Sequence, residues 1–128
     1  MKMKNIFFAI LMIATFTVIA QNGKIAILSP ADFNQKIKTE KGIILDVRTP
    51  GEFKKGHLKG ARLLDIFSDA FETEINKMDK NTTYYVYCQS GGRSGEATEL
   101  MHKKGFKVVY DLDGGFGRWK SQNLPFEQ

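Results

Sequence analysis

The chain has little that could cross-link it, since its 128 residues include one cysteine, Cys88. A single thiol cannot form a disulfide within the chain, so stability must come from packing, and the disulfide-stapled class of small domains is excluded. Cys88 also has no second cysteine to resolve a bond made at its sulfur. Any disulfide or sulfur exchange at Cys88 must therefore end on another molecule.

The chain also lacks an apolar run long enough for a membrane-spanning helix. Residues 6–19 are apolar apart from two threonines, and this run is shorter than the roughly 20 residues that a spanning helix requires. Lys2 and Lys4 precede the run, and the small residue Ala20 ends it. This order of a basic start, a short apolar stretch and a small residue is typical of a secretory signal peptide.

We therefore expect residues 1–20 to be a cleaved signal peptide and residues 21–128 to be one exported domain, periplasmic or extracellular. After cleavage, no stable association with a membrane is expected. An uncleaved membrane anchor is the alternative, because Val18 is not the small residue that the cleavage site prefers.

No basic stripe interleaved with aromatic residues is present. The formal charge is +5, from 19 basic and 14 acidic residues, but the basic residues are scattered, with short clusters only at Lys54–Lys55 and Lys103–Lys104. This distribution is typical of a solvated surface and excludes a nucleic-acid-binding face.

Short apolar runs alternate with segments of helical spacing along the chain. The expected strands are 25–28, 43–47, 62–64, 83–87 and 106–110. Two helices are expected to begin at Ser29–Pro30 and at Thr49–Pro50, and two more are expected over 67–78 and 95–104. Alternation of this kind predicts an α/β fold with a central, mostly parallel sheet and helices on both faces.

Cys88 stands where the strand over 83–87 ends and a helix is about to begin. The segment that we call the Cys88 loop, residues 88–94, continues with Gln89, Ser90, Gly91, Gly92, Arg93 and Ser94. Two adjacent glycines allow the backbone to curl and to turn its N–H groups toward one point. With the positive end of the following helix and the charge of Arg93, the loop favours an anion, and we expect a reactive thiolate held at the mouth of the sheet.

Charged residues also close the strand over 43–47. Asp46 and Arg48 lie at its carboxyl end, the edge predicted for Cys88, and open α/β sheets bind ligands at that edge. A buried structural thiol and a surface arginine are the alternatives for Cys88 and Arg93.

Three motifs, in this order and at these separations, resemble those of single-domain rhodaneses. They are Leu45–Arg48 with Glu52–Phe53 and Gly56–Ala61, then Val86–Ser94, then Leu112–Phe116 with Trp119. The resemblance implies a rhodanese-like α/β fold and a sulfurtransferase that forms a persulfide on Cys88. It implies a sulfur donor such as thiosulfate, a cyanide, thiol or protein acceptor, and no metal or organic cofactor.

The resemblance also suggests roles for residues outside the cysteine. Residues 89–94 would bind the substrate, with Arg93 closing the loop and steadying an anionic donor. Asp46 and Arg48 match the family's Asp-x-Arg pair, and we expect Arg48 to form an ion pair with Glu52 that braces the rim of the site. His57 lies in the Gly-His-x-x-Gly-Ala segment, where packing and hydrogen bonding are expected rather than general base catalysis.

Two other functions compete with sulfur transfer. Related phosphatases place their arginine one position further from the cysteine than the distance from Cys88 to Arg93, and the shorter ring suits a sulfur better than a tetrahedral oxyanion. A phosphatase or arsenate reductase is therefore less favoured. An exported binding module or sulfur-relay domain with a protein partner is the other alternative.

Overall fold

Five parallel strands form one sheet in the computed structural model, which describes residues 12–15 and 23–128. The strands are β1 (Lys24–Leu28), β2 (Ile43–Asp46), β3 (Arg62–Leu63), β4 (Thr83–Tyr87) and β5 (Val108–Leu112), in the order β1-β5-β4-β2-β3. The predicted α/β fold with a parallel sheet is confirmed. The central strands β4 and β5 are almost entirely buried, as their continuous apolar runs indicate.

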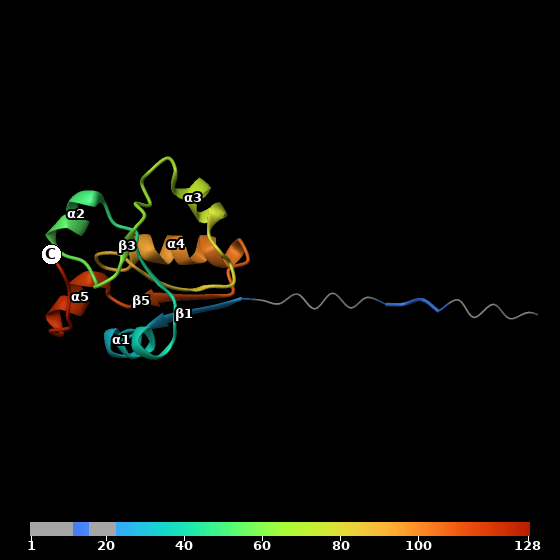
Figure 1. Ribbon diagram of the computed structural model, residues 1–128, viewed down its shortest axis with the longest axis horizontal. Helices are drawn as coiled ribbons and strands as arrows, with labels where there is room; N and C mark the ends of the chain where they lie inside the picture. Colours follow the sequence, from blue (N-terminus) through green and yellow to red (C-terminus); the bar gives the residue numbers. More distant parts are fainter. Residues whose placement is uncertain (1–11, 16–22) are drawn as a thin grey trace, which may run out of the picture.

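Helices cover both faces of this sheet, as predicted. The helices are α1 (Pro30–Thr39), α2 (Pro50–Lys55), α3 (Phe71–Lys77), α4 (Gly92–Lys103) and α5 (Gly115–Ser121). Figure 1 shows α1 on one side of the sheet and α3 with α4 on the other. Two core clusters follow from this arrangement, one with Ile75 and Met101 beneath α3 and α4, the other with Phe33 and Trp119 beneath α1 and α5.

The first two helices begin where the sequence predicts. Ser29 and Thr49 are N-caps whose hydroxyls accept hydrogen bonds from the backbone of Asp32 and Glu52, and a proline follows each cap. Proline suits this position because its missing N–H would have no partner in the first turn. Each cap therefore fixes where the chain turns back after a strand.

The covering helix predicted over 67–78 is shorter, and α3 begins only at Phe71. The side chains of Asp65 and Ser68 accept hydrogen bonds from the backbone N–H groups of Phe67 and Ala70, and such local bonds favour turns over helix. Phe67 therefore lies outside the helix, and 69% of its surface is exposed.

The last strand begins two residues later than predicted, at Val108. Phe106 instead belongs to the turn after α4, where its N–H donates to the carbonyl of Met101. Its ring is buried edge-on against Tyr84, so Phe106 contributes to the core without joining the sheet.

The expected signal peptide over 1–20 lies outside the described residues, except for residues 12–15, which have no regular secondary structure. Among residues 12–15 and 23–128, no helix has the length and apolar character needed to cross a bilayer.

Candidate active site

Cys88 directly follows β4 at the carboxyl edge of the sheet, the place predicted from the sequence. Its exposure differs from the expectation, because only 1% of the residue is accessible and it packs with the core cluster beneath α4. The sulfur therefore lies at the floor of the Cys88 loop and not at the mouth of the sheet. This burial follows from α4 beginning early and bringing the buried Ser94 over the sulfur.

Polar groups surround the sulfur despite its burial. The backbone N–H of Gly91 donates to Cys88 Sγ at 3.0 Å, and Sγ lies 3.4 Å from Ser94 Oγ. Burial by itself raises the pKa of the thiol, but the Ser94 side chain and the amides of Ser94, Gly91 and Ser90 lower it, and the result is a Cys88 pKa below its usual value. The loop thus favours the thiolate, the nucleophilic form of cysteine.

The Cys88 loop is shorter than expected, because α4 begins at Gly92 and not at Gly95. Gly91 has a φ of 117°, a conformation that other residues rarely adopt. This turn places Arg93 and Ser94 in the first turn of the helix, while Gln89 and Ser90 are exposed. The positive end of α4 therefore lies beside the sulfur.

The backbone at the start of α5 hydrogen-bonds to the backbone of the Cys88 loop. The N–H groups of Phe116 and Gly117 donate to the carbonyls of Cys88 at 2.8 Å and Gln89 at 3.0 Å. Gly115 has a φ of 61°, and a Cβ there would lie 2.5 Å from the carbonyl oxygen of Cys88. The glycine pair that follows β5 thus allows the backbone of α5 to approach the backbone that carries the cysteine.

Asp46 and Arg48 form a buried ion pair, and this corrects the predicted pairing of Arg48 with Glu52. Arg48 Nη2 lies 2.7 Å from Asp46 Oδ2, and Nε donates to both carboxylate oxygens. The guanidinium also donates to the carbonyl of Gly56 at 2.6 Å and to Gln89 Oε1 at 3.2 Å. Arg48 therefore links the end of β2 to the Cys88 loop from inside the fold.

Glu52 pairs with Arg93 instead, at 3.1 Å between Arg93 Nη2 and Glu52 Oε2. The guanidinium of Arg93 also lies 5.8 Å from the ring of Phe67. This pair joins α2 to the first turn of α4. Glu52 therefore braces the rim of the site, but its partner is Arg93 of the Cys88 loop and not Arg48. A donor anion at Arg93 would have to compete with this carboxylate.

His57 lies at a junction between α2 and the C-terminal segment. Its ring stacks on Phe53 with 3.8 Å between centroids, Nδ1 contacts the Phe53 carbonyl at 2.9 Å, and Nε2 lies 3.5 Å from Glu127 Oε2. These contacts serve packing and hydrogen bonding. In the described part of the chain, no three His, Cys, Asp or Glu side chains lie close enough together to hold a metal ion.

Asp111 is a buried acidic residue that is not among the predicted site residues. It is the fourth of the five residues of β5, is 4% exposed, and its Oδ1 has no hydrogen-bond partner. Burial raises its pKa to about 6, although the Ser94 hydroxyl acts in the opposite direction. An acidic residue inside the apolar run Val108–Leu112 was the available signal.

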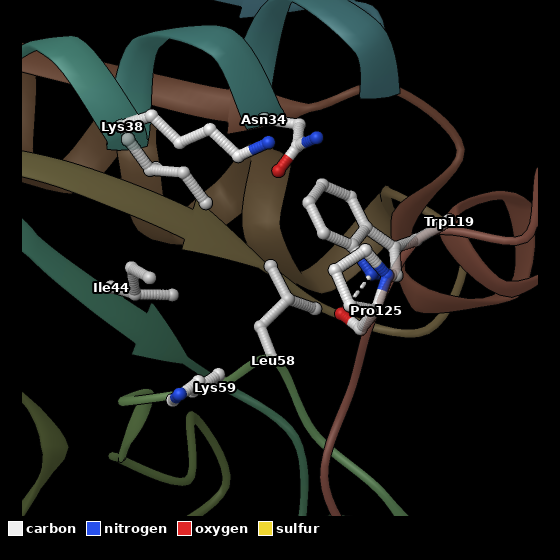
Figure 2. Close-up of a pocket in the computed structure, with 8 residues that line it drawn as sticks. Asn34, Lys38, Ile44, Leu58, Lys59, Trp119 and Pro125 are labelled. Atoms are coloured by element: carbon white, nitrogen blue, oxygen red, sulfur yellow. Dashed lines mark hydrogen bonds between the residues drawn. The ribbon is translucent and has the colours of Figure 1, made fainter.

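A separate cavity of about 260 Å³ lies on the α1 and α5 face of the sheet (Figure 2). Its lining residues are Asn34, Ile37, Lys38, Ile44, Leu58, Lys59, Trp119 and Pro125. None of them is a predicted site residue, so this cavity is distinct from the Cys88 loop.

The lowered pKa of Cys88 predicts that its alkylation by iodoacetamide has a pH midpoint below that of a free thiol. The rate should be lower overall than that of a free thiol because the sulfur is buried. The Ser94→Ala variant should shift the pH midpoint of alkylation upward, because it loses the hydroxyl at 3.4 Å. Alkylation rates measured by mass spectrometry across pH test this. Ser90→Ala, which changes only an exposed side chain, is the control, and a wild-type midpoint at or above that of a free thiol would contradict the prediction.

The raised pKa of Asp111 predicts a pH-dependent stability. The fold favours the protonated form of the Asp111 carboxyl. The stability that this form contributes is fully present below 3.8, the pKa in the unfolded chain, and is lost as pH rises through about 6, the pKa in the folded chain. We expect the stability of Asp111→Asn relative to wild type to rise by about 2 kcal/mol between pH 4 and pH 7. Urea unfolding at both pH values measures this, with Glu99→Gln on an exposed face of α4 as the control. An equal difference at both pH values would contradict it.

Comparison with known proteins gives a family match over the part of the chain that forms this fold and holds this site. The family model described as a rhodanese-like domain matches residues 29–122, which include every site residue discussed above. An uncharacterized protein, YqhL, of Bacillus subtilis is 37% identical over 79 residues, covering 62% of this chain and 61% of that protein. A tRNA uridine(34) hydroxylase of Chlamydia abortus is 34% identical over 115 residues, covering 78% of this chain but 35% of that enzyme.

Solved structures agree on the fold. A rhodanese-related protein of Thermoplasma volcanium superposes with a TM-score of 0.71 at 25% identity, covering 80% of this chain and 97% of that one. A rhodanese-like domain protein of Staphylococcus aureus gives a TM-score of 0.67 at 26% identity, covering 80% and 99%. The match thus covers almost the whole of these two solved structures, while it spans about three fifths and about a third of the two curated relatives.

Proposed function

This chain belongs to the rhodanese-like domain family, and from that premise we propose that it is a sulfurtransferase. It moves a sulfane sulfur from a donor such as thiosulfate to cyanide or a thiol, through a persulfide on Cys88. The observation that carries the proposal is the Cys88 sulfur itself, which accepts a backbone N–H bond at 3.0 Å and has a pKa below its usual value.

The chemistry proceeds in two displacements at sulfur. The Cys88 thiolate attacks the outer sulfur of thiosulfate, an S–S bond to Sγ forms, and sulfite leaves with the electron pair of the bond that breaks. Cyanide or a thiolate then attacks the outer sulfur of the persulfide, and Cys88 leaves as a thiolate. The two substrates react in turn, so ping-pong kinetics are expected.

The Cys88 loop supplies what this reaction needs. A persulfide carries its negative charge on the terminal sulfur, about 2 Å from Sγ. The Gly91 N–H lies 3.0 Å from Sγ, and α4 begins at the next residue. N–H groups at this place would stabilise the persulfide anion as an oxyanion hole does. Persulfide formation also places the reacting atom one bond beyond the buried Sγ.

Intact mass after thiosulfate treatment tests the proposal. Wild-type protein should gain the mass of one sulfur, cyanide should remove it, and Cys88→Ser should gain nothing. Absence of any gain in wild type would favour the binding module. Activity on a chromogenic phosphate ester would favour a phosphatase, for which Arg93 lies one position too close to Cys88.

A protein acceptor is a second candidate for the sulfur, favoured by one observation. Phe67 is 69% exposed and lies beside Arg93 at the rim of the site, a combination that suits a protein surface better than it suits cyanide. Phe67→Ala should then slow transfer to the protein acceptor while leaving transfer to cyanide unchanged.

Export remains part of the proposal, with residues 1–20 as the cleaved segment and the domain acting in the periplasm or outside the cell. The measurement is the mass of the protein recovered from its producing cells, which should correspond to a chain that begins at Gln21.

A further inference from the structure

We propose that the cavity on the α1 and α5 face of the sheet binds a small carboxylic acid with an apolar body, such as an arylacetic acid. The cavity has a volume of about 260 Å³. An apolar cavity of about 150 Å³ is enough to hold benzene, so this cavity has room for an aromatic ring with a short acidic side chain. Its lining includes no residue of the Cys88 loop, and the proposal therefore does not depend on sulfur transfer.

The cavity lies over a part of the sheet that α1 does not cover. This helix packs mainly on β1 and β5, whereas Ile44 belongs to β2, on the far side of β4. Ile44 is therefore only partly buried. Leu58 and Trp119 are each 1% exposed and form the inner wall. The result is an apolar hollow over β2 in place of a packed core.

Two lysines reach this hollow from different elements. Figure 2 shows Asn34 and Lys38 on the α1 side of the cavity and Lys59 on the other side, on the segment that follows α2. Asn34 and Lys38 are four residues apart on α1 and so share a face of the helix. Both lysines are exposed, so their aliphatic stems can line the cavity while their amino groups stay at its mouth.

The positive charge of these lysines is not balanced within the cavity. No residue of the lining is acidic. Within residues 23–128, neither Lys38 nor Lys59 forms an ion pair, whereas Lys36 on the same helix pairs with Glu40 at 2.9 Å. An anion at the mouth of the cavity would therefore supply the counter-charge that the fold does not provide.

A carboxylate fits this set of donors better than a phosphate or a sulfate does. Besides the two lysines, the polar side chains of the lining are the Asn34 amide and the Trp119 indole, and the indole N–H already donates to the Pro125 carbonyl at 2.9 Å. A carboxylate has only two oxygens to satisfy, and an apolar body would cover Ile44 and Leu58. Sites for small ligands commonly combine apolar walls with a few polar groups in this way.

Trp119 makes binding measurable without any reaction. It is the only tryptophan of the chain, and its ring lines the cavity, so a ligand there should change its fluorescence. We expect phenylacetate to do so with a dissociation constant on the order of 1 mM, ordinary for a ligand of about ten heavy atoms. Phenylacetamide keeps the shape without the charge and should bind about fivefold more weakly. A concentration of phenylacetate well above its dissociation constant should also raise Tm by a few degrees.

Removing the two charges should abolish the preference for the acid. In the double variant Lys38→Gln with Lys59→Gln, phenylacetate should bind about fivefold more weakly than in wild type, while phenylacetamide should bind equally well. The matched control is Lys54→Gln with Lys55→Gln, which removes the same charge from exposed lysines of α2 that do not line the cavity. The Cys88→Ser variant should bind phenylacetate as wild type does, even if the protein transfers no sulfur.

The Ile44→Phe variant tests whether the ligand lies inside the cavity. A larger side chain on β2 would fill the space, so neither the acid nor the amide should bind. The lysine variants change only exposed side chains and decide the proposal if Ile44→Phe does not fold. Equal affinity for acid and amide in wild type would overturn the proposal, and so would an equal loss in the control. No change in Trp119 emission with either compound, the result expected if a partner protein covers the cavity or another part of the chain fills it, would overturn it as well.

Discussion

The Cys88→Ser variant is expected to transfer sulfur at least about 10³-fold more slowly than wild type, the scale of loss that follows removal of a nucleophile. A serine hydroxyl is not ionised at neutral pH, even where one N–H at 3.0 Å favours an anion. It therefore cannot attack thiosulfate or form a persulfide. Steady-state thiocyanate formation from thiosulfate and cyanide measures the loss.

Two controls make this result specific. Serine differs from cysteine by one atom. The free energy of unfolding of Cys88→Ser should therefore change little, while its rate of sulfur transfer falls by at least about 10³-fold. The Ser90→Ala variant alters an exposed side chain of the same loop and should keep its activity within a few fold. Residual transfer by Cys88→Ser within tenfold of wild type would show that another group carries the sulfur.

The Asp46→Ala variant is expected to lose about 3–5 kcal/mol of unfolding free energy, because it leaves the guanidinium of Arg48 buried without a counter-charge. Arg48 is 1% exposed, and its partners besides Asp46 are the neutral Gly56 carbonyl and Gln89 amide. Chemical denaturation at neutral pH measures the loss. Activity should fall as well, because Arg48 holds Gln89 of the Cys88 loop.

Two further variants separate the buried pair from ion pairs in general. Glu74→Ala breaks an exposed pair with Lys77 at 3.3 Å and should cost less than about 1 kcal/mol. Replacing both members, Asp46→Leu with Arg48→Met, should recover much of the stability lost in Asp46→Ala, because no charge then remains buried. A loss below about 1 kcal/mol in Asp46→Ala would mean that water or another acidic group reaches Arg48.

The fold could be predicted from the sequence because its signals are local. A cap and a proline at Ser29–Pro30 begin α1 without reference to the rest of the chain, and the continuous apolar run before Cys88 marks a strand buried on both faces. The boundary of α4 could not be predicted in this way. Gly91 and Gly92 are equally typical of a loop, and only the backbone turn at Gly91 shows that the helix begins between them.

Residues of the site were predicted, but their partners were not. Asp46 and Glu52 are both near Arg48 in the sequence, and the choice between them depends on Arg48 turning inward, where only Asp46 lies. Glu52 is then left to pair with Arg93, which is distant in sequence. Asp111 could not be singled out because the sequence does not show that its carboxyl is buried with Oδ1 left without a hydrogen-bond partner.

The strand order has a consequence for how the chain is made. β1 is the first strand synthesised, but its one neighbour in the sheet is β5, the last. During translation β1 has to wait until residues 108–112 have left the ribosome, and closing so long a loop is slow compared with forming a helix. The sheet is therefore completed late, and until then the first strand has an open edge that could pair with another chain.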